Sequence, residues 1–310
     1  MTTPQLLPTA AEVTAGVDLT GSRALVTGTT AGIGAETARV LAAAGAEVLM
    51  TGRTEEGARA ACARVAADVP GARLVPLALD LGSLASVRAC AAALLADGAP
   101  LHRIIANAGV MAAPEGRTED GFETHIGVNH LGHFALLTAL QPALLAAGSA
   151  RVVILSSAGH RWSDVDLDRL AEGPAPYDPY LAYGASKTAN ALCAVELDRR
   201  WRDDGVRAFA VHPGAIHTDL GRHFSTADRE QIEATAATNG IAFRTVPQGA
   251  ATSVWAAVAP ELADRGGLYL TDCAVAEVTG PESPRGVRDY ALDGEHAARL
   301  WTVSERLVGC

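Results

Sequence analysis

The stretch RALVTGTTAGIG, residues 23–34, decides the fold of this 310-residue chain. Its first half is an apolar run that predicts a buried strand, and a helical pattern begins at Gly34. Glycine adopts the backbone conformations that a tight turn needs, and it lets backbone N–H groups approach a diphosphate at the positive end of a helix. Because the glycines lie between a strand and a helix, they predict a dinucleotide-binding turn, with a simple tight turn as the alternative. The residues predicted to contact the dinucleotide here are Gly28, Thr30, Gly32, Ile33 and Gly34.

Apolar runs and helical patterns alternate along the rest of the chain, as is typical of βαβ units and a parallel sheet. Strands are predicted over residues 23–28, 47–53, 73–80, 102–109, 151–157, 206–214 and 267–272. Helices are predicted over residues 34–44, 55–69, 83–96, 121–146 and 180–202. This pattern predicts an α/β protein, a Rossmann-type doubly wound parallel sheet of about seven strands with helices on both faces.

No repeat or low-complexity linker divides this series, so residues 1–310 are predicted to form a single domain. Residues 1–20 are an N-terminal extension of it. The polar, Pro-rich insertion 161–179 and the partly helical segment 218–245 interrupt the alternation. Both follow the carboxyl ends of strands, where open α/β sheets hold ligands, so 218–245 is predicted to form a substrate lid. The charged residues of the insertion are predicted to face solvent.

The composition and charge of the chain argue against several classes of binding partner. The net charge is −10 and the pI is near 5.4, which argues against nucleic acid and anionic membranes, because both select basic surfaces. The five cysteines are scattered and unpaired in sequence, as in a reducing compartment. The first residues lack the pattern of a signal peptide, and no apolar run reaches membrane-spanning length. We therefore expect a cytoplasmic protein.

The sequence Tyr183-Gly-Ala-Ser-Lys187 places a phenol and an ammonium group on one face of a predicted helix, because residues four apart are neighbours there. A nearby positive charge favours the phenolate, so Lys187 is predicted to lower the pKa of Tyr183 from its usual value near 10. A tyrosine tuned in this way can exchange a proton with an alcohol oxygen.

The end of the second predicted strand indicates which cofactor is bound. A carboxylate at this place usually binds the ribose hydroxyls of NAD, whereas a cation accommodates the 2′-phosphate of NADP. The chain has Gly52-Arg53 there, so NADP is preferred and NAD stays possible, with a solvated surface arginine as the alternative. Asp80 ends the third strand and either contacts the adenine or serves a turn. Asn107 is predicted to tie neighbouring strands together.

Seven motifs, in order, make the chain resemble the short-chain dehydrogenase/reductases over residues 20–275, in the single-domain form of that family. They are TGTTAGIG at 27–34, DL at 80–81, ANAG at 106–109, Asn129, SS at 156–157, YGASK at 183–187 and HPGAIHT at 212–218. Within the family, NHLGHF at 129–134, the insertion 161–179 and GLYLTDC at 267–273 resemble the retinol-dehydrogenase-like branch.

The resemblance implies a catalytic role for four residues. Ser157 would bind the substrate oxygen, and Tyr183 would be the general acid in reduction and the general base in oxidation. Lys187 would bind the nicotinamide ribose and lower the tyrosine pKa, and Asn129 would hold a water of a proton relay. Besides the turn and Arg53, the implied cofactor contacts are Asp80, Leu81, Asn107, Ala108, Gly109, Tyr183, Lys187, Pro213, Gly214, Ile216 and Thr218.

These inferences predict an NADP-dependent oxidoreductase that interconverts an alcohol and a ketone or aldehyde. Apolar residues of the two loops favour a lipophilic small-molecule substrate, although they could also form the loops' own core: Trp162, Phe224, Ile232, Ile241 and Phe243. The short glycine turn and the lack of a large C-terminal substrate domain count against an epimerase or dehydratase of the extended family. The presence of Ser157, Tyr183 and Lys187 counts against a catalytically silent, NADP-binding sensor protein.

Two further expectations concern metals and subunits. His130 and His133 are three apart on a predicted helix, which is a ligand-compatible spacing, but no Cys, Asp or Glu cluster completes a site. No metal is therefore predicted. The resemblance implies a homodimer or homotetramer built from the helices 121–146 and 180–202.

Overall fold

In the computed structural model, which describes residues 7–310, one sheet of eight strands runs through the chain. The strand order is β3-β2-β1-β4-β5-β6-β7-β8, and all neighbours are parallel except the last pair. The strands are β1 (Arg23–Val26), β2 (Glu47–Gly52), β3 (Arg73–Ala78), β4 (Arg103–Ala106), β5 (Ala150–Leu155), β6 (Val206–His212), β7 (Leu268–Thr271) and β8 (Ala274–Val275). The predicted α/β fold is thus confirmed, with one strand more than expected. Residues 1–6 of the N-terminal extension lie outside the described residues.

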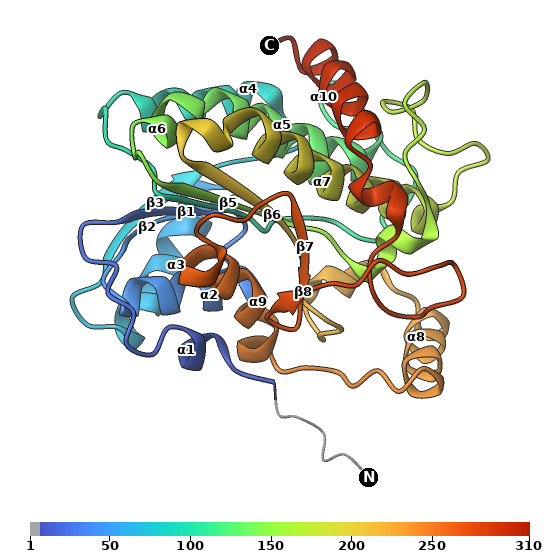
Figure 1. Ribbon diagram of the computed structural model, residues 1–310, viewed down its shortest axis with the longest axis horizontal. Helices are drawn as coiled ribbons and strands as arrows, with labels where there is room; N and C mark the ends of the chain where they lie inside the picture. Colours follow the sequence, from blue (N-terminus) through green and yellow to red (C-terminus); the bar gives the residue numbers. More distant parts are fainter. Residues whose placement is uncertain (1–6) are drawn as a thin grey trace.

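Helices cover both faces of the sheet, as Figure 1 shows. One face carries α2 (Gly32–Ala43), α3 (Glu55–Asp68) and α9 (Val246–Val258), with the short α1 (Ala10–Val13) packed against α9. The other face carries α4 (Leu84–Leu95), α5 (Gly132–Ala139), α6 (Gln141–Leu145), α7 (Pro179–Trp201) and α10 (Gly294–Val308). Apart from one arginine near the start of each and His212 at the end of β6, the central strands β1, β4, β5 and β6 are apolar. Leu25, Ile104 and Phe209 are fully buried, because a parallel sheet is covered on both sides.

Side chains that accept hydrogen bonds from free N–H groups mark where several helices begin. Thr54 caps α3, Ser83 caps α4, and Asp178 caps α7, each by accepting a backbone N–H of the first turn. By contrast, α2 begins after Ala31 with no side-chain cap. Its first N–H groups are therefore available to a ligand.

The predicted helix 121–146 is not one helix. The structure divides it into a π-helical segment η1 (Ile126–Leu131), then α5 and α6, with Leu140 between them in a non-helical conformation. Pro142, in the first turn of α6, explains the break, because proline lacks an N–H and its ring clashes with the preceding turn of a helix. The predicted Gly121 start is also too early, since residues 121–123 precede the helical backbone.

The C-terminal region adds elements that were not predicted, namely α9, the antiparallel β8 and α10. The helix α10 packs along α7, and its Trp301 ring lies 4.8 Å from that of Phe134 in α5 and 5.9 Å from that of Trp201 in α7. It therefore covers part of the helix face that was expected to join subunits. The predicted lid 218–245 contains η4 (Asp219–His223) and α8 (Thr226–Thr238), which lies apart from the sheet in Figure 1. Among residues 7–310, no helix is both long and apolar enough to cross a bilayer.

Candidate active site

A large open cavity lies along the carboxyl ends of the strands and brings together almost all of the predicted site residues. Its volume is about 2720 Å³. A single ligand pocket usually measures ~300–1,000 Å³, so this one has room for a dinucleotide and a substrate. Its walls include every predicted cofactor residue together with Ser157, Tyr183 and Lys187. Asn129 lies behind the wall and is fully buried.

The glycine turn is packed so tightly that side chains would not fit. Gly28 has a φ of +71°, and a Cβ atom there would lie 2.9 Å from the Cβ of Ala108. A Cβ atom on Gly34 would lie 2.3 Å from the carbonyl oxygen of Gly28. Gly32, with a φ of +60°, lies below Thr218 of the lid segment. Together with the uncapped start of α2, this backbone cradle fits the diphosphate of a dinucleotide.

The predicted tie between strands is made by Asn107, at the end of β4. Its Nδ2 donates to the carbonyl oxygens of Thr27, at 2.8 Å, and Gly28, at 3.3 Å. In return, the Thr27 hydroxyl accepts the N–H groups of Asn107 and Ala108 at 2.9 and 3.0 Å. The loop after β4 is thereby fixed beside the glycine turn.

The cavity wall at the end of β2 contains Arg53, and no carboxylate of the segment that follows β2 lines the cavity. Arg53 is exposed and makes no hydrogen bond or ion pair within residues 7–310, whereas Glu55 pairs with Arg59. Arg64 in α3, which the sequence reasoning missed, donates to the carbonyl oxygen of Thr30 at 2.7 Å. Asp80 accepts the N–H of Gly82 at 2.9 Å, so it makes the turn contact that was one of its two predicted roles.

Tyr183 and Lys187 lie on one face of α7, as predicted, and both are buried. The ammonium nitrogen of Lys187 lies 5.6 Å from the centre of the Tyr183 ring and donates to the carbonyl oxygen of Leu155 at 2.9 Å. Burial raises the pKa of Tyr183 to about 12, although a hydrogen bond with Ser157 acts the other way. Burial lowers the pKa of Lys187 to about 7. The expected depression of the tyrosine pKa is therefore wrong, because burial disfavours the charged form of both groups.

The two serines after β5 have separate environments. Ser156 is buried and donates its hydroxyl proton to the carbonyl oxygen of Lys187 at 2.7 Å. The Ser157 hydroxyl accepts the N–H of Gly159 at 3.1 Å and caps the short helix η2 (Ala158–Trp162). Because the proton of Ser156 is already used, Ser157 is the serine that can offer a hydroxyl to a ligand.

Asn129 lies in the π-helical segment η1, and its side chain has no free polar group. Its Oδ1 accepts the N–H of Val110 at 2.8 Å, and its Nδ2 donates to the carbonyl oxygen of Val110 at 3.0 Å and to the Ser186 hydroxyl at 2.9 Å. A relay water on Asn129, as the family resemblance implies, would therefore have to bind the main-chain carbonyl.

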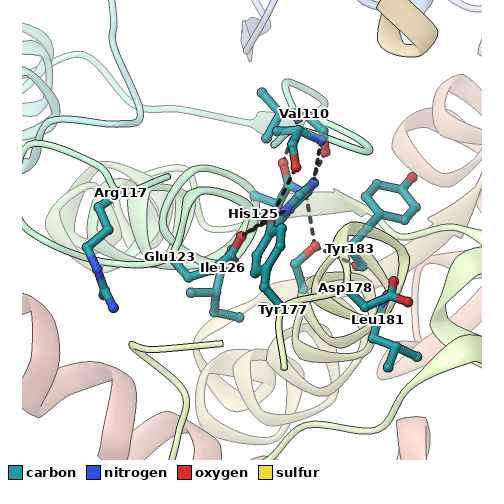
Figure 2. Close-up of polar contacts among 12 residues, drawn as sticks. Val110, Arg117, Glu123, His125, Ile126, Tyr177, Asp178, Leu181 and Tyr183 are labelled. Carbon is teal, nitrogen blue, oxygen red and sulfur yellow. Dashed lines mark hydrogen bonds and ion pairs between the residues drawn. The ribbon is translucent and has the colours of Figure 1, made fainter. Parts of the chain in front are cut away.

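A buried cluster behind the substrate side of the cavity was not predicted (Figure 2). The ring of His125 lies 2.8 Å from Glu123 through Nδ1, and its Nε2 accepts the N–H of Ala113 at 3.1 Å. Tyr177 of the insertion donates to the carbonyl oxygen of Ala113 at 3.0 Å. Burial of Glu123 would raise its pKa, but hydrogen bonds from His125 hold that pKa below its usual range. The ring of His125 meets that of Tyr183 edge-on at 6.2 Å.

The lid segment closes the other side of the cavity. His217 stacks on Phe243 at 4.2 Å, and Arg244 forms an ion pair with Asp272 at the end of β7. The five apolar loop residues named above all line the cavity. Arg161 also lines it and is half-buried, so the expectation that every charge of the insertion faces solvent is wrong. Its position shortly after the predicted strand 151–157, at whose carboxyl end a ligand is expected, was the available signal.

Residues 22–229 match the short chain dehydrogenase family, and the chain belongs to that family. It is 43% identical over 295 residues to a probable oxidoreductase of Streptomyces lividans, covering 92% of this chain and 97% of the relative. It is also 43% identical to the polyprenol dehydrogenase of Mus musculus, covering 93% and 84% of the two chains. Among solved structures, the gluconate 5-dehydrogenase of Burkholderia cenocepacia in complex with NADP and tartrate has a TM-score of 0.65 and 25% identity, covering 82% and 94%.

Membership of this family makes the protein an oxidoreductase that uses a nicotinamide dinucleotide and acts on CH–OH groups of small molecules. The assignment to the retinol-dehydrogenase-like branch stays a prediction.

Proposed function

We propose that this protein is an NADP-dependent oxidoreductase that interconverts a lipophilic alcohol and the corresponding ketone or aldehyde, with Tyr183 as the general acid and base. The observation that carries the proposal is the buried phenol of Tyr183 in the wall of the cavity beside the hydroxyl of Ser157, where burial raises the pKa of Tyr183 to about 12. A group that keeps its proton at neutral pH is suited to donate it when the substrate oxygen gains negative charge.

Each of the three residues Ser157, Tyr183 and Lys187 has its own role in carbonyl reduction. The bound cofactor supplies a hydride to the carbonyl carbon, and in oxidation it accepts one. The Ser157 hydroxyl orients the carbonyl oxygen, and Tyr183 gives that oxygen its proton. Burial lowers the pKa of Lys187 to about 7, so this lysine can take up and release a proton near neutral pH, and its ammonium nitrogen lies 5.6 Å from the centre of the Tyr183 ring.

Preference for NADP is supported by the charges around β2. Arg53 is free of any partner within residues 7–310, and a guanidinium group binds phosphate with two parallel hydrogen bonds. Arg64 adds a second positive charge at Thr30, and the nearest acidic residue of the chain, Glu55, is held by Arg59. A carboxylate that would repel the 2′-phosphate is therefore missing from the end of β2 in the described part of the chain.

A lipophilic substrate is supported by the lining of the two loops, which presents Trp162, Phe224 and Phe243 to the cavity. The mouse relative is, by its name, a dehydrogenase of polyprenol. We propose an apolar secondary or primary alcohol of the same general chemical kind. A cytoplasmic location and a homo-oligomeric state stay predictions.

The test follows nicotinamide absorbance with NADPH, NADH and their oxidised forms, against a panel of lipophilic ketones, aldehydes and alcohols. Turnover with NADPH that falls by at least ~10²-fold in Tyr183→Phe supports the proposal, because general acid–base catalysis contributes typically 10²–10⁴-fold. A preference for NADH would overturn the role of Arg53. Tight NADPH binding without turnover of any compound would favour the sensor protein, and turnover of a nucleotide sugar without net redox change would favour an epimerase.

A further inference from the structure

The loop Asn107–Val110, between the glycine turn and Lys187, is held at both of its ends by buried side chains. At its start, the Thr27 hydroxyl accepts the N–H groups of Asn107 and Ala108. At its end, the side chain of Asn129 binds both the N–H and the carbonyl oxygen of Val110. Between these ends, a Cβ atom on Gly109 would lie 3.6 Å from the ammonium nitrogen of Lys187, so the loop passes directly against the lysine.

One residue, His133 in α5, joins the two anchors of this loop. Its Nε2 lies 2.9 Å from the hydroxyl oxygen of Thr27, and its Nδ1 lies 3.0 Å from the carbonyl oxygen of Asn129. Only 1% of the residue is exposed. The charged or titratable groups that act on the ring are Lys187 and the neighbouring His130.

The hydrogen bonds determine which nitrogen of His133 carries the proton. A hydroxyl group has two acceptor sites and one proton, and both acceptor sites of Thr27 are used by backbone N–H groups. Thr27 must therefore donate its proton to Nε2 of His133. The proton of a neutral ring is then on Nδ1 and is donated to the carbonyl oxygen of Asn129, consistent with burial lowering the pKa of His133 to about 4.

We propose that His133 is a positioning residue that braces Thr27 against Asn129 and thereby holds the loop Asn107–Val110 in place for the cofactor and for Lys187. The inference rests on the proposed function, because that function places the cofactor on this loop. His133 touches neither the cavity nor the reacting atoms, so it acts through the residues that it joins.

The two hydrogen bonds of the His133 ring, one at each nitrogen, can be removed separately. In His133→Asn, the amide nitrogen takes the place of Nδ1 and keeps the bond to Asn129, but it cannot reach Thr27. In His133→Gln, the amide takes the place of Nε2 and keeps the bond to Thr27, but it leaves the Asn129 carbonyl without this donor. His133→Phe removes both bonds and keeps most of the ring volume.

His130 provides the matched control. It is as buried as His133 and lies on the same helical run, but its Nε2 contacts the hydroxyl of Ser304 in α10 at 2.8 Å. Within residues 7–310 it makes no hydrogen bond to Thr27, to Asn129 or to the loop Asn107–Val110. His130→Gln is expected to lower the melting temperature and to leave cofactor binding within about twofold of wild type.

The first measurement is the NADPH dissociation constant from nucleotide fluorescence at 25 °C, recorded for variants whose circular dichroism shows that they are folded. We expect His133→Asn and His133→Gln to weaken binding about tenfold each, and His133→Phe more, because an unsatisfied buried group costs about 1–3 kcal/mol and 1.4 kcal/mol is tenfold. Folded variants that bind NADPH as wild type does, with only a lower melting temperature, would reduce His133 to a packing residue and overturn the proposal.

The second measurement does not depend on cofactor or substrate. Long-range ¹⁵N–¹H spectra of histidine-labelled wild-type protein distinguish the two neutral tautomers, and assignment by His133→Gln identifies the ring. A neutral ring with its proton on Nδ1 supports the brace, and a proton on Nε2 or a charged ring at pH 7 overturns it. If wild-type protein binds no nicotinamide nucleotide, the proposed function fails, while these spectra still decide whether the brace exists.

Discussion

Lys187 is the only lysine of the chain, and it is buried with its ammonium group against the carbonyl oxygen of Leu155. Burial lowers its pKa to about 7, because a charge inside the protein loses its hydration. We expect the [ε-¹³C]lysine spectrum of the protein to show one side-chain resonance that titrates near pH 7. A midpoint near 10 would show that the ammonium group is solvated or paired, contrary to the structure.

The same shift predicts how Lys187 affects stability. A lysine whose pKa is lower in the folded state than in the unfolded state adds stability above about pH 10.5, and this is lost as the pH falls towards 7, by about 1.4 kcal/mol per pH unit. Lys187→Met should therefore raise the free energy of unfolding at pH 6 and do so much less at pH 9. Asn190 also donates to the Leu155 carbonyl, at 2.9 Å, so we expect this carbonyl to keep a partner in the variant. An equal gain in the free energy of unfolding at pH 6 and pH 9 would contradict the lowered pKa of Lys187.

Sequence reasoning at this scale could predict that Tyr183 and Lys187 are neighbours, because helical spacing is a local property. It could not predict the direction of the tyrosine pKa. That direction depends on burial, which arises from segments far apart in the chain. The roles of Thr27 and His133 were out of reach for the same reason, since the contact between these two residues joins positions 106 apart in the chain.

At the scale of elements, the phenol of Tyr177 is one of the groups that hold the insertion 161–179 against the active-site wall, together with the carbonyl oxygen of Ala171, which accepts the N–H of Glu123. Tyr177 donates to the carbonyl oxygen of Ala113 and lies 3.3 Å from a carboxylate oxygen of Glu123. The hydroxyl also lies 3.4 Å from Nδ1 of His125, and Tyr177→Phe removes all three contacts but keeps the ring. We expect faster amide exchange in 161–179 and a several-fold higher KM for the substrate, with NADPH binding unchanged, because the contacts of this hydroxyl are with Ala113, Glu123 and His125 and not with the glycine turn or Arg53. If NADPH binding weakened as much as the KM for the substrate rose, Tyr177 would support the cofactor site as well as the substrate site, contrary to this prediction.

Seven of the eight strands and the helices α2, α3, α4 and α7 were predictable because their hydrophobic patterns are local and long. The helix 121–146 was mispredicted for two physical reasons. Pro142 interrupts it, and the π-helical segment η1 changes the phase of its residues, so that Asn129 points to the loop after β4. No simple hydrophobic periodicity of the sequence predicts a π-helix, which is rare and often lies at functional sites.

At the scale of the whole molecule, α10 is the unpredicted element that matters most for the structure. It is amphipathic and has Asp293 as its cap and Gly309 after its end, so the local signals were present. What could not be read from them is the surface on which it packs. In the structure it covers the outer side of α7, where Ala189 and Leu192 join Leu300 in one buried cluster. An interface between subunits was expected at that place.

Trp301 tests whether α10 is required to cover this surface. The residue is 4% exposed, its ring packs on Phe134 and Trp201, and Arg200 lies over it at 4.7 Å. Trp301→Ala should lower the free energy of unfolding by about 3–5 kcal/mol, the usual cost of removing a buried aromatic ring. Thr302→Ala, at the exposed neighbouring position, should change it by less than about 0.5 kcal/mol. Because loosening of α10 bares apolar surface on α7, light scattering should also show more self-association in Trp301→Ala than in wild type. If Trp301→Ala had the free energy of unfolding and the light-scattering mass of wild type, α10 would not be required to cover α7. This face of α7 would then be free to join another subunit.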